Sequence, residues 1–168
     1  MRKQALSRRW VVNASPLIAL CKVGRQGLIF NLADAVVIPQ AVVDEINAGP
    51  QNDPARRFLL EGPAPIAAVA PHPSVVTWDL GAGETAVLSY AYAHPGWTAI
   101  IDDGAARRCG KALGVPLNGT LGIIIGARRA GLIASAAPIL KDLQSEGFRL
   151  RDDVIEAALH TIVGETWT

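Results

Sequence analysis

A small set of polar residues stands where predicted strands give way to helices, and these residues are the first candidates for chemistry. In chain order the set consists of Asn13, Glu45, Glu84 and the pair Asp102–Asp103. Ligands of open α/β sheets collect at the carboxyl ends of the strands, so we expect these side chains to converge. Carboxylate and amide oxygens suit Mg²⁺ or Mn²⁺. Such a cation lowers the pKa of a bound water and offsets charge on a phosphodiester.

Each of these acids also has an ordinary structural explanation. Glu84 would be favoured by the dipole of the helix that it opens, and Glu45 could lie on a solvated face. Asp102 or Asp103 could cap the helix that follows. Ser15 is expected to be an N-cap under either interpretation. For each acid taken singly, the structural explanation is at least as good as the metal-site explanation. The structural explanations do not account for the expected position of all the acids at one end of a sheet.

The elements that must position these residues alternate between strand and helix. Strands are predicted at 10–14, 35–39, 74–78, 98–102 and 115–118. Helices are predicted at 17–23, 26–32, 40–49, from Asp53 onward, 84–93, 103–113, 119–130, 138–146 and 152–163, and the proline-rich stretch 63–73 is predicted to be a connection. This alternation predicts an α/β fold in three layers, with a mainly parallel sheet of four or five strands and helices on both faces.

Length and composition exclude several classes of protein. A chain of 168 residues is about one domain, so we expect one domain over 1–168, with a core at about 11–148 and a C-terminal helix at 152–163. The 50% hydrophobic content excludes a disordered chain, and a net charge of +1 excludes a strongly basic coat protein. Two cysteines without metal-ligand spacing give no zinc site. No apolar run is long enough for a membrane span, and the run after the basic start breaks at Asn13, so we expect a cytoplasmic protein.

Several segments resemble a known family. VVNASPLIAL, IPQAVVDEI, GAGETAVLSYA, IIDDGAARRCGKALGV and NGTLGIIIGARRAGLI, in this order and spacing, look like PIN domains. The greatest similarity is to an uncharacterised bacterial branch related to the VapC-like toxin ribonucleases. The resemblance runs from about Val11 to Phe148, and its most specific part is the NGTLG…GLI segment together with IDD-x-x-x-R.

The resemblance implies a metal-dependent nuclease that cuts RNA with three or four acids around Mg²⁺ or Mn²⁺. It places the catalytic carboxylates on Glu45, Glu84, Asp102 and Asp103. Many PIN sequences would align the last acid with Asp103, whereas the pattern of this branch favours Asp102. The first family Asp falls on Asn13, which joins the acids as a neutral metal ligand and which weakens the charge that holds the cation.

Two hypotheses for function follow from this resemblance. The first is an endoribonuclease that is the toxin of a toxin–antitoxin pair, with a small antitoxin protein as partner. The second, prompted by Asn13, is a catalytically weakened PIN-fold module that binds nucleic acid without cleaving it. A small-molecule protein of flavodoxin or receiver type is a third class, disfavoured because the NASPLI segment lacks a glycine-rich phosphate loop.

The sequence also predicts residues that bind the substrate and an assembly of two chains. Phosphate binding is assigned to Ser15 and to three cations on the helix after Asp103, namely Arg107, Arg108 and Lys111. An ordinary solvated face explains the three cations equally well. A homodimer is expected because the resemblance implies one, and because the apolar residues of two short helices exceed what one core face needs. These apolar residues are Leu17, Ile18, Leu28 and Ile29.

Overall fold

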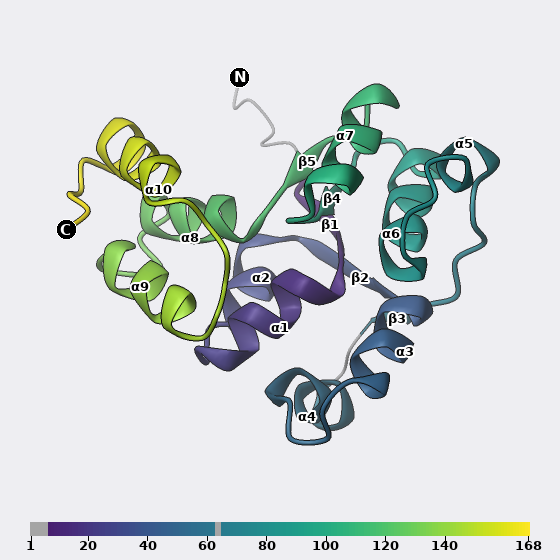
Figure 1. Cartoon of the computed structure of the whole chain (residues 1–168), viewed down its shortest axis with the longest axis horizontal. Helices are drawn as coiled ribbons and strands as arrows, with labels where there is room; N and C mark the ends of the chain where they lie inside the picture. Colours follow the sequence, from purple (N-terminus) through teal and green to yellow (C-terminus); the bar gives the residue numbers. More distant parts are fainter. Residues whose placement is uncertain (1–6, 63–64) are drawn as a thin grey trace.

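One parallel sheet forms the centre of the molecule in the computed structural model, which describes residues 7–62 and 65–168 (Figure 1). The strands are β1 (Arg9–Val12), β2 (Ala35–Pro39), β3 (Ile66–Ala67), β4 (Trp97–Ile100) and β5 (Leu117–Asn118). Their order across the sheet is β3-β2-β1-β4-β5, and every pairing is parallel. In β1, Val11 pairs with Val37 of β2 and with Ala99 of β4. The predicted α/β fold with a parallel sheet is confirmed.

Helices cover both faces of this sheet. Before β4 the helices are α1 (Ala14–Lys22), α2 (Gly27–Leu32), α3 (Gln40–Ala48), α4 (Pro54–Glu61), α5 (Pro73–Val76) and α6 (Ala82–Ala93). After β4 they are α7 (Gly104–Ala112), α8 (Thr120–Arg129), α9 (Ala137–Ser145), α10 (Asp152–Ala158) and the π-helix η1 (Leu159–Val163). Helices α1, α2, α8 and α9 pack together on one side, while α6 and α7 lie on the other (Figure 1).

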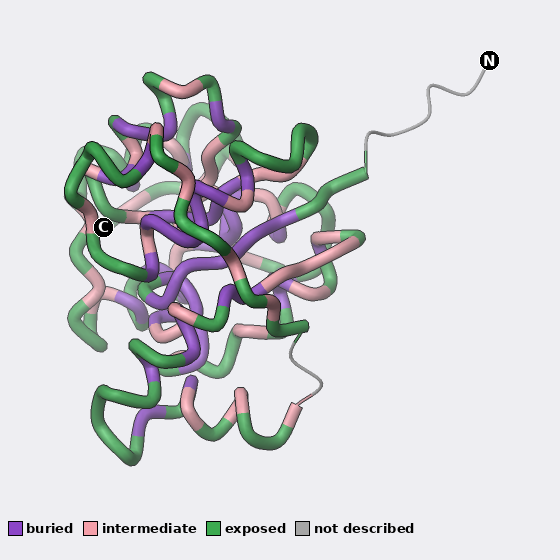
Figure 2. Tube along the Cα trace, turned by 90° about the vertical axis from the view of Figure 1, so that its right-hand side faces the viewer, coloured by how far each residue is buried: buried purple, intermediate pink, exposed green. Residues whose placement is uncertain are grey.

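The central strands are buried on both faces, which explains their continuous apolar sequences. Val11 and Val12 of β1 have no exposed surface, and neither does Ile100 of β4. Buried segments run through the middle of the molecule, and exposed segments form its rim (Figure 2). The ladder continues past both strands, because the backbone N–H of Asn13 donates to the Ile100 carbonyl at 3.1 Å and the N–H of Ile101 donates to the Asn118 carbonyl at 2.9 Å. The residues that follow β1 and β4 are therefore held side by side at the rim of a rigid core.

The prediction of a third strand at 74–78 is wrong. Residues Pro73–Val76 form the short helix α5, with Pro73 in its first turn, where a missing N–H costs nothing. His72 caps this helix, because its Nδ1 accepts a hydrogen bond from the N–H of Ser74 at 3.1 Å. The β-branched residues of the segment suggested a strand, but Val75 is buried as part of a helical turn.

The third strand lies instead in the stretch that was predicted to be a connection. Ile66 and Ala67 pair with the end of β2, and Ile38 N–H donates to the Pro65 carbonyl at 2.9 Å. Proline is tolerated here because β3 is at the edge of the sheet, where half of the N–H groups need no partner within the sheet. The chain then reaches α6 through α5, so Glu84 does not directly follow a strand.

The apolar residues that suggested a dimer face are used within the chain. Leu17, Leu28 and Ile29 are buried in the core, and Ile18 is half-buried against it. This sequence argument for a homodimer therefore does not hold, and the expectation rests on the resemblance. Among the helices of the described residues, none combines the length and the apolar character that crossing a membrane requires.

Candidate functional site

A cavity of about 580 Å³ lies at the carboxyl end of the sheet, where several elements bring polar residues together. Helices α1, α3 and α6 and the start of α7 contribute one part of its wall, and the end of α9 with the following loop contributes the rest. Its polar lining residues are Ser15, Lys22, Glu45, Glu84, Asp102, Asp103, Glu146 and Arg149. We call this the acid cavity. All the acids predicted from the sequence line it, although their sequence positions span almost sixty residues.

Asn13 borders the same region from the end of β1. It is 2% exposed, and its Oδ1 atom has no hydrogen-bond partner among the residues that the structure describes. Asn13 occupies the N-cap position of α1, yet its side chain accepts no bond from that helix. A buried amide oxygen without a partner is costly, so its presence needs an explanation.

Gly83 of α6 makes room for that oxygen. A Cβ atom at Gly83 would lie 3.1 Å from Asn13 Oδ1 and 2.5 Å from Glu45 Oε2. Both oxygens therefore face one point beside the α6 backbone, from two different elements. Any larger residue at position 83 would push Glu45 away from this point.

Glu45 and Glu84 carry like charges that the chain leaves unneutralised. The pKa of Glu45 is raised, first by partial burial and second by the negative charge of Glu84. In the described part of the chain, neither carboxylate takes part in a side-chain hydrogen bond or an ion pair. Glu84 lies in the first turn of α6, where the helix dipole gives it some stabilisation.

Asp102 is held by a neighbouring helix. Its two oxygens accept hydrogen bonds from Thr120 at the start of α8, one from the N–H at 2.8 Å and one from the hydroxyl at 2.7 Å. Burial nevertheless raises the pKa of Asp102 and outweighs these bonds and the nearby charge of Arg107. Arg107 in turn donates from Nη1 to the carbonyl of Ile101 at 2.9 Å. Asp102 is thus a fixed, half-buried carboxylate at the rim of the cavity.

Asp103 has a clear structural role. It is the N-cap of α7 and accepts a hydrogen bond from the N–H of Ala106 at 2.9 Å. Asp103 also lines the cavity, and only one of its oxygens accepts a hydrogen bond, whereas both oxygens of Asp102 do.

The residues that were predicted to bind substrate do not all lie in the acid cavity. Ser15 lines the acid cavity, but it lies inside the first turn of α1 and is not its N-cap, because the helix begins at Ala14. Arg107 lies between Asp102 and Gly119, and it lines a neighbouring cavity. Arg108 and Lys111 belong to α7 but do not line the acid cavity.

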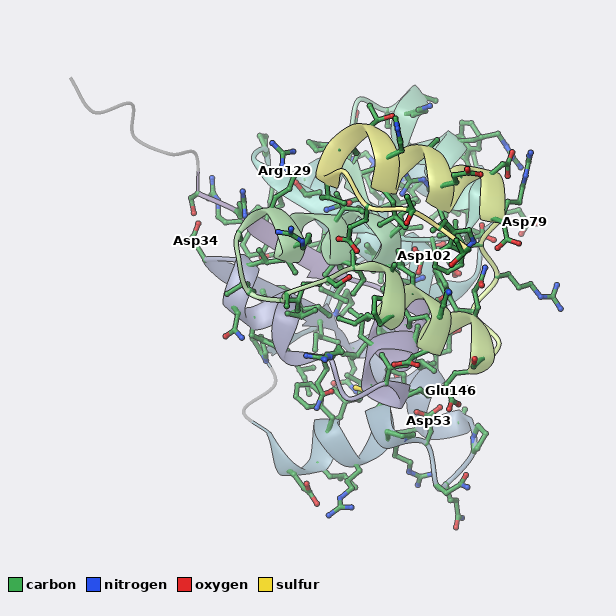
Figure 3. All side chains as sticks on the ribbon, turned by 90° about the vertical axis from the view of Figure 1, so that its left-hand side faces the viewer. Asp34, Asp53, Asp79, Asp102, Arg129 and Glu146 are labelled. Atoms are coloured by element: carbon green, nitrogen blue, oxygen red, sulfur yellow. The ribbon has the colours of Figure 1, made fainter. Side chains whose placement is uncertain are left out.

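Four charged or aromatic residues that line the acid cavity were not predicted from the sequence: Lys22, Glu146, Phe148 and Arg149. Lys22 follows Ser15 by seven positions, two turns along the same face of α1, so helical spacing could have found it. The other three belong to the end of α9 and the loop after it, and no local signal links them to the strand ends. Figure 3 shows Asp102 and Glu146 on the same side of the molecule, away from Arg129.

The donors fit a divalent cation in kind. They are all oxygens, and the partnerless Asn13 Oδ1 shares the space beside Gly83 with a Glu45 oxygen. Among residues 7–62 and 65–168, however, no three acidic, His or Cys side chains stand close enough together to hold an ion as they are placed. The residues that would hold a cation are Asn13, Glu45, Glu84 and Asp102 or Asp103, and of these Glu45 and Glu84 form no ion pair within residues 7–62 and 65–168.

Comparison with protein families agrees with this geometry. The family model DUF3368, described as a PIN domain, matches residues 9–164. The chain belongs to this PIN-domain family. PIN domains are generally nucleases that act on nucleic acids with the help of divalent cations, so the chain has a nuclease-type fold. No curated protein matches the sequence.

Proposed function

We propose that this PIN domain is a Mg²⁺- or Mn²⁺-dependent endoribonuclease and that it is the toxin of a toxin–antitoxin pair acting in the cytoplasm. The observation that carries the proposal is the unneutralised pair Glu45 and Glu84, next to the buried Asn13 oxygen that lacks a partner. Buried or clustered charge of one sign is costly unless a partner of opposite sign is supplied. A cation is the partner that fits an all-oxygen donor set.

In this proposal each part of the acid cavity has one task. Asn13, Glu45, Glu84 and Asp102 hold the cation, which when bound supplies charge stabilisation at the phosphodiester and a water of lowered pKa. Thr120 fixes Asp102 by its two hydrogen bonds, so that this carboxylate needs no reorganisation when substrate arrives.

Cations of the chain would bind the phosphate backbone. Lys22 at the end of α1 and Arg149 in the loop after α9 line the acid cavity from two sides, and both are exposed. The residues first assigned this task remain part of the proposal: Ser15, Arg107, Arg108 and Lys111. Exposed lysine and arginine side chains supply affinity without base specificity.

The test is a titration of Mg²⁺ and Mn²⁺ with a fluorescent single-stranded RNA across the natural sequence and four variants. We expect Glu84→Gln and Asp102→Asn to abolish cleavage, because each removes a negative charge from a set that already contains a neutral Asn13. We expect Asn13→Asp to raise cleavage at low metal concentration by tightening the site. Asp44→Asn is the matched control, since Asp44 is exposed and adjacent to Glu45 on α3. Equal activity in all four variants would contradict the assignment.

A binding module without cleavage is the second candidate, and two observations favour it. Position 13 carries an amide where the family resemblance implies Asp, and both oxygens of Asp102 are already engaged by Thr120. The same experiment separates the candidates. If the protein binds RNA and neither it nor Asn13→Asp cleaves with any divalent cation, the binding module replaces the nuclease.

The partners in this proposal are RNA, a small antitoxin protein and a second copy of the chain. A short reading frame that overlaps or adjoins this one, and whose product co-purifies with the chain, would support the toxin role. Light scattering tests the homodimer, and a monomer at high micromolar concentration would contradict it. Neither result bears on cleavage by the acid cavity.

A further inference from the structure

A second cavity, of about 370 Å³, adjoins the acid cavity and is lined mainly by apolar side chains instead of carboxylates. It lies between α8 and the C-terminal helices α10 and η1, and its walls are mainly apolar. The apolar wall residues are Leu121, Ile125, Leu150, Val154 and Ile162. Val154 and Ile162 are 41% and 47% exposed, so the described residues cover them only in part. We call this the apolar cavity.

The two cavities are neighbours, because Asp102 and Phe148 line both of them. Phe148 is half-buried and belongs to the loop between α9 and α10, directly after Gly147, whose φ of +91° lets the chain turn. An aromatic side chain therefore stands at the junction between a cavity lined by carboxylates and a cavity lined by aliphatic side chains.

The apolar cavity also has a polar end. Arg107 and Asn118 line it next to Asp102. Asn118 Oδ1 accepts a hydrogen bond from Gly119 N–H at 2.9 Å, while its Nδ2 donates to no group in the residues that the structure describes. A ligand in this cavity would meet apolar side walls, one aromatic ring, and a donor amide at the end nearest the acids.

We propose that the apolar cavity binds one base of single-stranded RNA, the base whose phosphate lies in the acid cavity. This inference rests on the proposed function and specifies how its substrate is held. A nucleobase has apolar faces and a polar edge, which matches apolar walls with Asn118 at one end. Its ribose joins it to a phosphate a few ångströms away, which matches two cavities that share Asp102. Phe148 provides a ring on which a base can stack.

A protein segment is the other possible occupant of an apolar surface, and two features favour the base. The apolar cavity shares Asp102 with the acid cavity, so its occupant must tolerate a carboxylate at one end, and a nucleotide whose phosphate is bound through a cation does so. The polar residues are gathered at that end, whereas a helix in a groove would be served by an apolar stripe with polar residues along the rim.

Binding of two fluorescent oligonucleotides of equal length tests the proposal. One is a single-stranded RNA, and the other has the same ribose-phosphate backbone without bases. Affinities are measured by anisotropy in Ca²⁺, alongside cleavage in Mn²⁺. We expect the protein to bind the base-bearing RNA about 5- to 100-fold more tightly, the range of one aromatic stacking contact. Phe148→Ala should abolish most of this preference and Phe148→Tyr should keep it.

Two further variants locate the base. Ala158→Leu adds volume inside the apolar cavity and should reduce the preference, whereas Ala157→Leu, exposed on the same helix, should not. Phe58→Ala, a half-buried phenylalanine on α4, controls for loss of an aromatic residue elsewhere. Circular dichroism of each variant verifies that it is folded.

Each outcome decides between the inference and the function on which it rests. Equal affinity of the natural sequence for both oligonucleotides, with RNA still cleaved, overturns the base cavity alone. A preference that survives both Phe148→Ala and Ala158→Leu also overturns it. Absence of binding to either oligonucleotide overturns the proposed function as well. If Phe148→Ala and Ala158→Leu instead weaken binding of a co-purifying protein and leave RNA binding unchanged, the apolar cavity is a protein-docking site.

Discussion

The carboxylates of the acid cavity and a carboxylate near the C-terminus of the chain have opposite environments. Near the C-terminus, Glu165 accepts hydrogen bonds from Ser135 Oγ at 2.6 Å and from the N–H groups of Ala136 and Ala137 at the start of α9. Arg128 Nε lies 3.3 Å from its Oε2, an ion pair without hydrogen-bond geometry. Although burial acts to raise it, the pKa of Glu165 is lowered by these donors.

In the acid cavity, Thr120 bonds to Asp102, but Glu45 and Glu84 take part in no side-chain hydrogen bond or ion pair among the described residues. Burial raises the pKa of Glu45 and of Asp102, and Glu84 adds a like charge next to Glu45. The chain is able to satisfy a carboxylate completely, as Glu165 demonstrates, so the deficit in the cavity is local and specific. A carboxylate satisfied by the chain contributes to stability, whereas one left unsatisfied in a cavity is available to a ligand.

Removing one charge from each region should give the largest contrast in activity. We expect Glu45→Gln to lower RNA cleavage at subsaturating Mn²⁺ by about 100-fold or more, because a cation held by two remaining carboxylates is held weakly. Glu165→Gln should leave cleavage by the folded protein within about two-fold, since Glu165 is not part of the cavity.

Initial rates of fluorescent RNA cleavage, measured on the same preparations, compare the two variants. Thermal melts verify that both variants are folded at the assay temperature. Similar losses of activity in the two variants would mean that the two regions differ in structure but not in their importance for RNA cleavage.

A divalent cation should stabilise the native protein. Mn²⁺ at a concentration 100 times its dissociation constant should increase the free energy of unfolding by about 2.7 kcal/mol, because it binds the native state alone. Glu84→Gln should lose most of this increase, and Glu165→Gln should keep it. Urea unfolding with and without Mn²⁺ measures the difference. An unchanged increase in Glu84→Gln would exclude Glu84 as a ligand.

Glu165→Gln should destabilise the protein by about 1–3 kcal/mol at neutral pH, because donors that now bond to a charge would face a neutral amide. The folded-state pKa of Glu165 lies below its unfolded value of 4.5, so this stabilisation is present above pH 4.5. It is lost as the pH falls through the folded-state pKa. Urea unfolding of both proteins from pH 7 down to pH 3 should show the two curves converge, and a constant gap would contradict the ionic origin.

Four of the five strands could be predicted from the sequence, because buried parallel strands have unbroken apolar runs. The acids that line the acid cavity could also be named from the sequence, although only the Asp102–Asp103 pair closely follows a strand. The strand predicted at 74–78 failed because β-branched residues after Pro73 form one turn of helix capped by His72, a context that propensity alone does not reveal.

The far side of the acid cavity could not be predicted in the same way. Phe148 and Arg149 reach it from a loop that tertiary packing of α9 positions, and no spacing in the sequence links them to Glu45. The same holds for Glu165, whose partners Ser135 and Ala136 lie about thirty positions earlier. Contacts between distant segments are the part of this molecule that only its structure supplies.

The smallest expected effect concerns the stability of the metal-free protein. Glu45 has a folded-state pKa above its ordinary value of 4.5, so ionising it opposes folding as the pH rises through that pKa. Glu45→Gln should therefore make the metal-free protein slightly more stable at pH 7, by no more than about 0.5 kcal/mol, since the side chain is exposed and solvent screens its charge. The gain should vanish below pH 4, where Glu45 is protonated in both states, and saturating Mn²⁺ should reverse its sign by stabilising only the carboxylate. Urea unfolding in EDTA and in Mn²⁺ at both pH values makes the comparison. A loss of stability in EDTA at pH 7 would show that the Glu45 carboxylate is satisfied by the chain, as Glu165 is, and would remove the contrast between the two regions.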